Sequence, residues 1–247
     1  MHYQQLTDTS TGRLTDVEAL VRWRLDDGTY RPPDDFIPVA EQSPLIVDLD
    51  RWVLASAARQ VSEWRRNGLP DLHLSVNASA RTISASGFVS HVLATLGQSD
   101  LAASALAIEV TETVLINDLD GAASRLSELR DQGIRIAIDD FGTGYTSVAQ
   151  LRSLPVDRLK IDRSFVARLD EQQEVSLVHL VIQIGQALGI EVVAEGVETE
   201  EQLTVLRELG CGVVQGFLHG RPLSAGDFEQ RHSCAAPVTD DVAGALV

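Results

Sequence analysis

Lysine is nearly absent from this sequence: Lys160 is the only one, and the other 19 basic residues are arginines. An arginine side chain keeps its proton in a protein, whereas neighbouring charges can tune the pKa of a lysine for chemistry. A stray lysine in an arginine-rich chain is the simpler interpretation. The residues around Lys160 have to decide between that interpretation and a role that a guanidinium group does not fill.

Cysteines are also few, and long apolar runs are absent. Cys211 and Cys234 lack the C-x-x-C spacing of a metal site, so we expect reduced thiols in a cytoplasmic protein. No run of about 18 apolar residues occurs, which predicts that this chain contains no membrane span. The first residues lack the basic and then apolar segment that is typical of a signal peptide.

Positive charge is scarce, because 20 basic residues face 36 acidic ones and the formal net charge is −16. Binding of duplex nucleic acid needs basic groups that replace counterions, so this charge argues against it. An anionic substrate would need metal ions or a local arginine to offset the field. The length of 247 residues and the hydrophobic content of 44% indicate a globular chain with one large domain or two small ones.

Short apolar segments rich in β-branched residues alternate along the chain with longer amphipathic segments. The short segments predict strands at residues 17–23, 73–77, 107–111, 135–140, 158–161, 191–195 and 213–217. The longer ones predict helices at residues 46–67, 88–96, 121–132, 147–154, 175–188 and 200–209. This alternation predicts a parallel sheet covered by helices, and a repeat of about 31 residues matches an α/β fold of the (β/α)8 TIM-type barrel. A doubly wound open sheet is the alternative, although no G-x-G-x-x-G motif follows the first strand.

A polar residue stands at or near the carboxyl end of each predicted strand. In a β/α barrel these ends meet around one mouth, where active sites are found. For any single residue a helix cap or a solvated loop is the simpler interpretation, but the recurrence on successive strands favours one shared site. The residues are Glu18, Asn77, Glu109, Asp139, Asp140, Lys160, Glu195 and Gln215.

The residue types in this set predict a site for hard metal ions. Carboxylate and amide oxygens suit Mg²⁺, Mn²⁺ or Ca²⁺ rather than Zn²⁺, and the six histidines form no H-E-x-x-H pattern. The adjacent Asp139 and Asp140 can serve two ions, and two ions about 3.5–4 Å apart form the clamp used for in-line attack on phosphodiesters.

Seven motifs occur in an order that resembles the EAL domain family of cyclic di-GMP phosphodiesterases, over about residues 3 to 226. They are Glu18-Ala19-Leu20-Val21-Arg22-Trp23, Ser75-Val76-Asn77, Glu109-Val110-Thr111-Glu112, Asp139-Asp140-Phe141-Gly142-Thr143-Gly144-Tyr145, Leu159-Lys160-Ile161-Asp162, Ala194-Glu195-Gly196-Val197-Glu198 and Gln215-Gly216. The three letters of the first motif alone carry little information, whereas the ordered set is specific.

The resemblance implies roles for individual residues of these motifs. Two Mg²⁺ or Mn²⁺ ions would be held by Glu18, Asn77, Glu109, Asp139 and Asp140, with Asp139 bridging and Glu195 assisting at the second ion. Lys160 would hydrogen-bond or help deprotonate the attacking water, so Lys160 and Glu195 are the candidate catalytic residues. The substrate would contact Gln4, Leu20, Arg22, Asp162 and Gln215. Glu112 would support the loop after Asp140, and Glu198 would lie behind the site.

The amino-terminal residues depart from the family pattern. Gln5 stands where the family has proline after Tyr-Gln, Asp16 stands where it usually has glycine, and only two residues precede Tyr3. We therefore expect the first strand and its helix to be truncated or irregular. We expect residues 1–233 to form the EAL domain and residues 234–247 to form a disordered tail.

The leading functional hypothesis is hydrolysis of cyclic di-GMP to linear pGpG. A catalytically inactive cyclic di-GMP receptor on the same fold is the runner-up, but receptors of that kind lose metal ligands, the lysine or the loop after the double aspartate, and none is lost here. An unrelated barrel enzyme, such as a metal-dependent aldolase or sugar-phosphate hydrolase, ranks below both. The resemblance also implies a homodimer formed around residues 141–154, and membership of a longer chain with a sensory or GGDEF domain.

Overall fold

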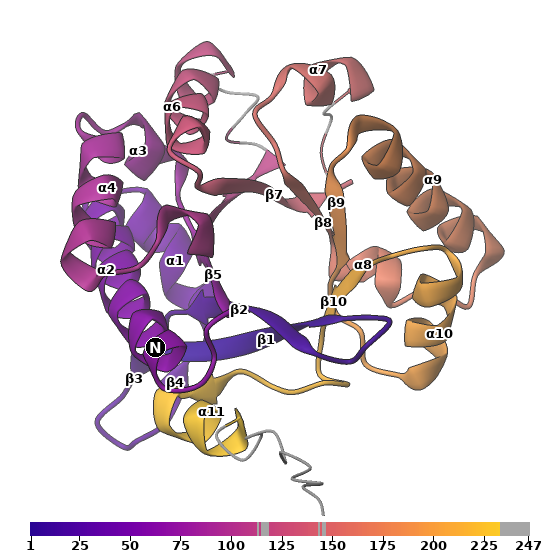
Figure 1. The fold of residues 1–247 in the computed structure, drawn as a ribbon, viewed down its shortest axis with the longest axis horizontal. Coiled ribbons are helices and arrows are strands. Elements are labelled where there is room, and N and C mark those ends of the chain that lie inside the picture. The colour runs from indigo at the N-terminus through magenta and orange to yellow at the C-terminus, as the bar shows by residue number, and fades with distance from the viewer. Residues whose placement is uncertain (113, 115–118, 143, 145–146, 233–247) are drawn as a thin grey trace, which may run out of the picture.

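The computed structural model describes residues 1–112, 114, 119–142, 144 and 147–232 (Figure 1). Within this part of the chain, eight strands form a closed barrel with helices around its outside. In sheet order from β10 back to β1, the strands are β10 (Val213–Gln215), β9 (Glu191–Ala194), β8 (Arg158–Ile161), β7 (Arg135–Phe141), β6 (Leu106–Thr111), β5 (His73–Asn77), β2 (Leu14–Leu20) and β1 (His2–Asp8). The pairing of β1 with β10 closes the ring, which confirms the predicted barrel and excludes the open sheet.

The long amphipathic segments form helices that cover the barrel, with bounds close to those predicted. They are α2 (Leu45–Arg66), α4 (Phe88–Ser99), α6 (Leu119–Asp131), α7 (Val148–Ser153), α9 (Gln172–Leu188) and α10 (Glu200–Glu208). The remaining elements are short and were not predicted: β3 (Trp23–Arg24), β4 (Tyr30–Arg31), α1 (Pro33–Glu41), α3 (Ala80–Ser84), η1 (Ala103–Ala105), α8 (Arg163–Val166), β11 (Leu223–Ser224) and α11 (Ala225–His232). The predicted strand at residues 17–23 begins earlier and ends at Leu20.

The first strand is complete rather than truncated, although it is irregular. β1 runs antiparallel to both β2 and β10, with a register shift between Leu6 and Thr7. No helix joins β1 to β2: a tight turn follows Asp8, whose Oδ1 accepts hydrogen bonds from the backbone N–H groups of Ser10 and Thr11 at 3.0 and 2.7 Å. The predicted tail, residues 234–247, lies outside the described residues.

The inside of the barrel is layered. Leu6, Val193 and Val213 are buried together in a small apolar cluster. At the amino-terminal ends of the parallel strands, Arg158 donates to both carboxylate oxygens of Asp16, at 3.0 and 3.3 Å, and its Nε donates to Glu191 Oε2 at 2.7 Å. The charged layer at this end accounts for Asp16, the acid that departs from the family pattern. The other end of the barrel carries the predicted site.

Candidate active site

Strand alternation brings the predicted side chains together at the carboxyl ends of the parallel strands. Side chains two residues apart in a strand share a face, so Asp16 and Glu18 both point into the barrel, as do Arg158 and Lys160. Asp16 and Arg158 belong to the charged layer described above, whereas Glu18 and Lys160 lie at the mouth. There, the Glu18 carboxylate accepts hydrogen bonds from two side-chain amides, Asn77 Nδ2 at 2.8 Å and Gln215 Nε2 at 2.6 Å.

Lys160 lies at the centre of the mouth and is fully buried. Its Nζ is 2.6 Å from a carboxylate oxygen of Glu109, 2.6 Å from one of Glu195, 3.1 Å from one of Asp139 and 3.5 Å from one of Glu18. Burial works to lower the pKa of Lys160, but these four carboxylates raise it well above its ordinary value. The only lysine of the chain is therefore an ammonium group with acids on several sides, which decides against the interpretation of a stray surface residue.

A bulge directs the two adjacent aspartates toward the same space. In a regular strand, neighbouring side chains point to opposite faces, but the pairing of β7 with β8 shifts register between Ile138 and Phe141. Asp140 takes a positive φ of 54°, which is uncommon for a residue other than glycine. As a result, one carboxylate oxygen from each of Asp139, Asp140 and Glu195 lies within 4.8 Å of the other two.

The mouth carries more negative charge than Lys160 neutralises. Burial, with the nearby Glu18 and Asp139, raises the pKa of Glu109 to about 7 even though Lys160 opposes the rise. Burial, with Asp139 and Asp162, raises the pKa of Asp140 to about 6. The buried Oε1 of Glu109 has no hydrogen-bond partner among the described residues. An unpaired carboxylate oxygen and crowded acids that resist ionisation fit a divalent cation with oxygen ligands, so this acidic cluster can hold metal.

A groove of about 1000 Å³ opens from the mouth, large enough for a small-molecule ligand. Asn77, Glu109, Asp139 and Asp140 line its inner end. Leu20, the last residue of β2, and Arg22 also line it. The half-buried Arg22 donates from Nη1 to the carbonyl of Val21 at 2.8 Å. Together with Arg81, which also lines the groove, it supplies the positive charge that a site for an anionic ligand needs in so acidic a chain.

The other predicted residues are placed as follows. Gln4 is buried beside the mouth, where its Oε1 accepts from Gln215 Nε2 at 3.2 Å. Asp162 caps the start of α8 by accepting from the Ser164 N–H at 3.0 Å, and it is close enough to raise the pKa of Asp140. Glu198 has an exposed side chain, and no interaction in the described part of the chain ties that side chain to the mouth.

Glu112 supports the segment that follows Asp140. Its Oε2 accepts from the backbone N–H groups of Gly142 at 3.4 Å and Gly144 at 3.1 Å. A Cβ on Gly144 would lie 2.6 Å from the Glu112 carboxyl carbon, so this contact requires glycine. Thr143 and Tyr145 of the same motif lie outside the described residues.

Sequence reasoning missed the outer wall of the groove. Pro33, Asp34 and Ile37 of α1 line it. A signal for this helix was present, because proline in the first turn followed by acidic residues is typical of a helix start. Asp50 of α2 also lines the groove and gave no signal, since an isolated acid in an amphipathic helix is ordinary.

Comparison with known proteins identifies the family. The model of the EAL domain matches residues 1–222. The chain belongs to the EAL domain family. Two similar proteins of Pseudomonas aeruginosa are the cyclic di-GMP phosphodiesterase NbdA, 41% identical over 93% of this chain and 30% of NbdA, and the bifunctional diguanylate cyclase/cyclic di-GMP phosphodiesterase MucR, 40% identical over 91% of this chain and 33% of MucR.

The EAL fold is confirmed by solved structures as well. The PaMucR phosphodiesterase in complex with c-di-GMP superposes with a TM-score of 0.89 at 40% identity, covering 92% of each chain. This EAL chain spans roughly a third of the length of the curated relatives it matches, at 30% and 33% for the two above. In the described part of the chain, no helix has the length and apolar composition of a membrane span.

Proposed function

We propose that this EAL domain is a metal-dependent phosphodiesterase that hydrolyses cyclic di-GMP to linear pGpG. The observation that carries the proposal is the set of carboxylates around Lys160, which opens into a groove bordered by Arg22. The relatives named for this activity and the c-di-GMP complex of the similar structure support the choice of substrate.

The acids and Asn77 would hold two Mg²⁺ or Mn²⁺ ions. Glu18, Asn77, Glu109 and Asp139 would bind the first, and Asp139, Asp140 and Glu195 the second. The support for the second set is the approach of its three carboxylates to within 4.8 Å. Bound divalent ions would supply Lewis-acid stabilisation of the phosphodiester and would lower the pKa of the attacking water.

The chain's own residues would position the reactants. Lys160, protonated among its carboxylates, would donate a hydrogen bond that orients the attacking water, and Glu195 would fix the Lys160 ammonium from the side of β9. Arg22 and Gln215 would contact the phosphates and guanines of the substrate. Gln4, Leu20 and Asp162 would complete the substrate contacts, and Glu112 would hold the backbone beyond Asp140.

We also propose that the domain works in a larger cytoplasmic assembly. The greater length of the relatives, and the second activity in the name of MucR, support a longer chain with a sensory or GGDEF domain. A homodimer formed around residues 141–154 would couple association to the backbone beyond Asp140, and the exposed Val148 on α7 supports this surface. Light scattering that shows a monomer at every concentration, with full activity, would remove the dimer from the proposal.

The test of hydrolysis is incubation of the purified chain with cyclic di-GMP and Mn²⁺ or Mg²⁺, followed by chromatography of the products. We expect pGpG to form only with metal present. Binding of cyclic di-GMP without product would instead identify the inactive receptor. Absence of both binding and product would exclude cyclic di-GMP as the ligand.

A further inference from the structure

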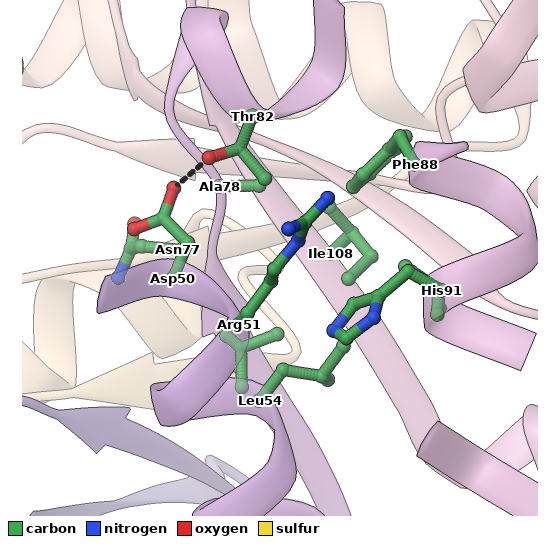
Figure 2. A pocket seen from close by; sticks show the side chains of 11 residues that line it. Asp50, Arg51, Leu54, Asn77, Ala78, Thr82, Phe88, His91 and Ile108 are labelled. Carbon is green, nitrogen blue, oxygen red and sulfur yellow. Dashed lines mark hydrogen bonds between the residues drawn. The ribbon is translucent and has the colours of Figure 1, made fainter. Parts of the chain in front are cut away.

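Asp50, a residue of α2 outside the set of predicted site residues, accepts three hydrogen bonds on a single carboxylate oxygen. Its Oδ2 is 3.0 Å from the backbone nitrogen of Ser79, 2.7 Å from Ser79 Oγ and 2.6 Å from Thr82 Oγ1. Figure 2 shows the Asp50 carboxylate directed at Thr82, with Asn77 beside it. Burial raises the pKa of Asp50, and these donors oppose the rise.

The donors belong to the segment that presents Asn77 to the mouth. Ser79 is two residues beyond Asn77, and its Oγ also accepts from the Thr82 N–H at the start of α3. Ala78 lies between Asn77 and Ser79 in the sequence, and its N–H donates to the Glu109 carbonyl at 2.9 Å. Glu18 therefore holds the amide group of Asn77, and Asp50 of α2 holds the backbone that follows Asn77.

Packing alone does not fix this segment, because a cavity lies behind it. The cavity has a volume of about 20 Å³ and is lined by Asp50, by apolar side chains that include Phe88 and Ile108, and by the polar Arg51 and His91. Such a space holds roughly one water molecule. The segment therefore has room to shift away from the mouth, and the hydrogen bonds to Asp50 oppose that shift.

We propose that Asp50 is a positioning residue for the metal site: through Ser79 and Thr82 it fixes the backbone that aims the Asn77 amide oxygen at the cation. The inference rests on the metal site of the proposed function, and it adds a residue that is not among the proposed metal ligands. Groups that orient metal ligands affect affinity, and their removal typically weakens metal binding by about 10–100-fold.

The test is Mn²⁺ binding to the full chain, measured by calorimetry beside thermal unfolding. Asp50→Ala should weaken Mn²⁺ binding by about 10–100-fold, even at temperatures where the variant is fully folded. Asp48→Ala is the matched control, because Asp48 lies on the same helix, is exposed and, within the described part of the chain, pairs only with Arg51, at 3.9 Å. It should bind Mn²⁺ as the wild type does.

Two further variants separate positioning from a general loss of stability. Thr82→Val removes one donor at nearly constant volume. The double variant Asp50→Ala/Thr82→Val should lose less Mn²⁺ affinity than the sum of the two single losses, because the two residues share one interaction. Ser79→Thr retains the hydroxyl and should restore the affinity that Ser79→Ala loses. If Asp50→Ala does not fold, Thr82→Val against wild type decides the question.

The inference would be overturned if folded Asp50→Ala bound Mn²⁺ with wild-type affinity. If Asp50→Ala does not fold, wild-type affinity in Thr82→Val would overturn it. Since the readout is cation binding, it does not depend on turnover. Mn²⁺ binding that depends on Asp50, in a chain that forms no pGpG, would support the inference and contradict the proposed function. A wild-type chain that does not bind Mn²⁺ would overturn both.

Discussion

Arg158 binds both carboxylate oxygens of Asp16 inside the barrel, although 142 residues separate the two in the sequence. Both side chains are almost fully buried. Removing one partner of a buried ion pair leaves an uncompensated charge in a poorly solvated place, which is far more damaging than loss of a surface pair. The pair is also distinct from the mouth, so its loss should act on folding rather than on metal binding.

We expect Arg158→Met to lower the free energy of unfolding by about 3 kcal/mol, the low end of the cost of breaking a buried pair, because Asp16 loses its bidentate partner but keeps Arg135 at 3.1 Å. Arg130→Met is the matched control: Arg130 pairs with Asp157 at 2.8 Å but is half-exposed. That pair should be worth about 1 kcal/mol or less. Urea unfolding measures both values, and equal losses would show that burial of the Asp16–Arg158 pair has no special effect.

Stability should also depend on pH through Asp16. Burial works to raise the pKa of Asp16, but Arg158 and Arg135 bring it below its ordinary value of 3.8. A group with a lowered folded pKa contributes stability above its unfolded pKa, and this contribution disappears as the pH falls through the folded value. The difference in unfolding free energy between wild type and Asp16→Asn should be constant above about pH 5 and shrink below about pH 4. A difference that does not change across that range would contradict the prediction.

Lys160→Arg and Lys160→Ala should both fold and bind cyclic di-GMP, yet lose turnover by roughly 10²-fold or more, the effect of misplacing the attacking water that the Lys160 ammonium orients. The Lys160 ammonium contacts carboxylates of four different strands or strand ends in a fully buried space, and a planar guanidinium does not match those positions. Calorimetric affinity paired with turnover measures the effect. Near-wild-type turnover in Lys160→Arg would reduce the lysine to a counter-charge.

Metal identity should matter for turnover. Mg²⁺ and Mn²⁺ accept compact oxygen sites, whereas Ca²⁺ prefers longer bonds and more ligands, so Ca²⁺ should bind and inhibit. Product formation should stop in excess chelator, return with Mn²⁺ and fall again when Ca²⁺ competes. Full activity in chelator would rule out the metal-dependent mechanism.

Gly144→Ala should reduce turnover by about 10²-fold, since the added Cβ would meet the Glu112 carboxyl carbon at 2.6 Å and push this carboxylate away from the backbone N–H groups that it holds beyond Asp140. Gly97→Ala is the control, because a Cβ there meets nothing within 4 Å and Gly97 lies inside helix α4. That change should leave turnover as it is and stabilise the chain by about 0.5–1 kcal/mol. Equal turnover in the two variants would remove Glu112 from the mechanism.

Local patterns were sufficient to predict most of the barrel. β5 and β8 have the bounds that were predicted, because apolar residues alternate with polar ones through each strand: Leu74 and Val76 in β5, Leu159 and Ile161 in β8. β1 was underestimated, since Gln4 and Gln5 interrupt its apolar pattern. Those amides donate to the carbonyls of Gly220 and His219, contacts that exist only once the chain has folded.

The composition of the mouth was also predictable, whereas its precise shape was not. The positions of Glu109 and Lys160 near the ends of predicted strands identified them as site residues. The bulge that directs Asp139 and Asp140 toward the same space could not be predicted, because it depends on how β7 pairs with β8. Asp50 was beyond reach for a similar reason. Its role comes from the packing of α2 against the segment after β5, and neither helix periodicity nor motif spacing encodes that contact.

The β1–β10 pairing also constrains when the barrel can form during synthesis. Gln4 and Gln215, which meet beside the mouth, are 211 residues apart. Until β10 leaves the ribosome, β1 has its hairpin partner β2 but presents an unpaired edge on its other side, and an open edge is a template for pairing with other chains. Ring closure should therefore be a late step with a large loop-closure entropy. A circular permutant that joins the end of α11 to β1 would make that step more local while keeping the contacts of Gln4 and Gln5, and it should fold faster without any change at the mouth.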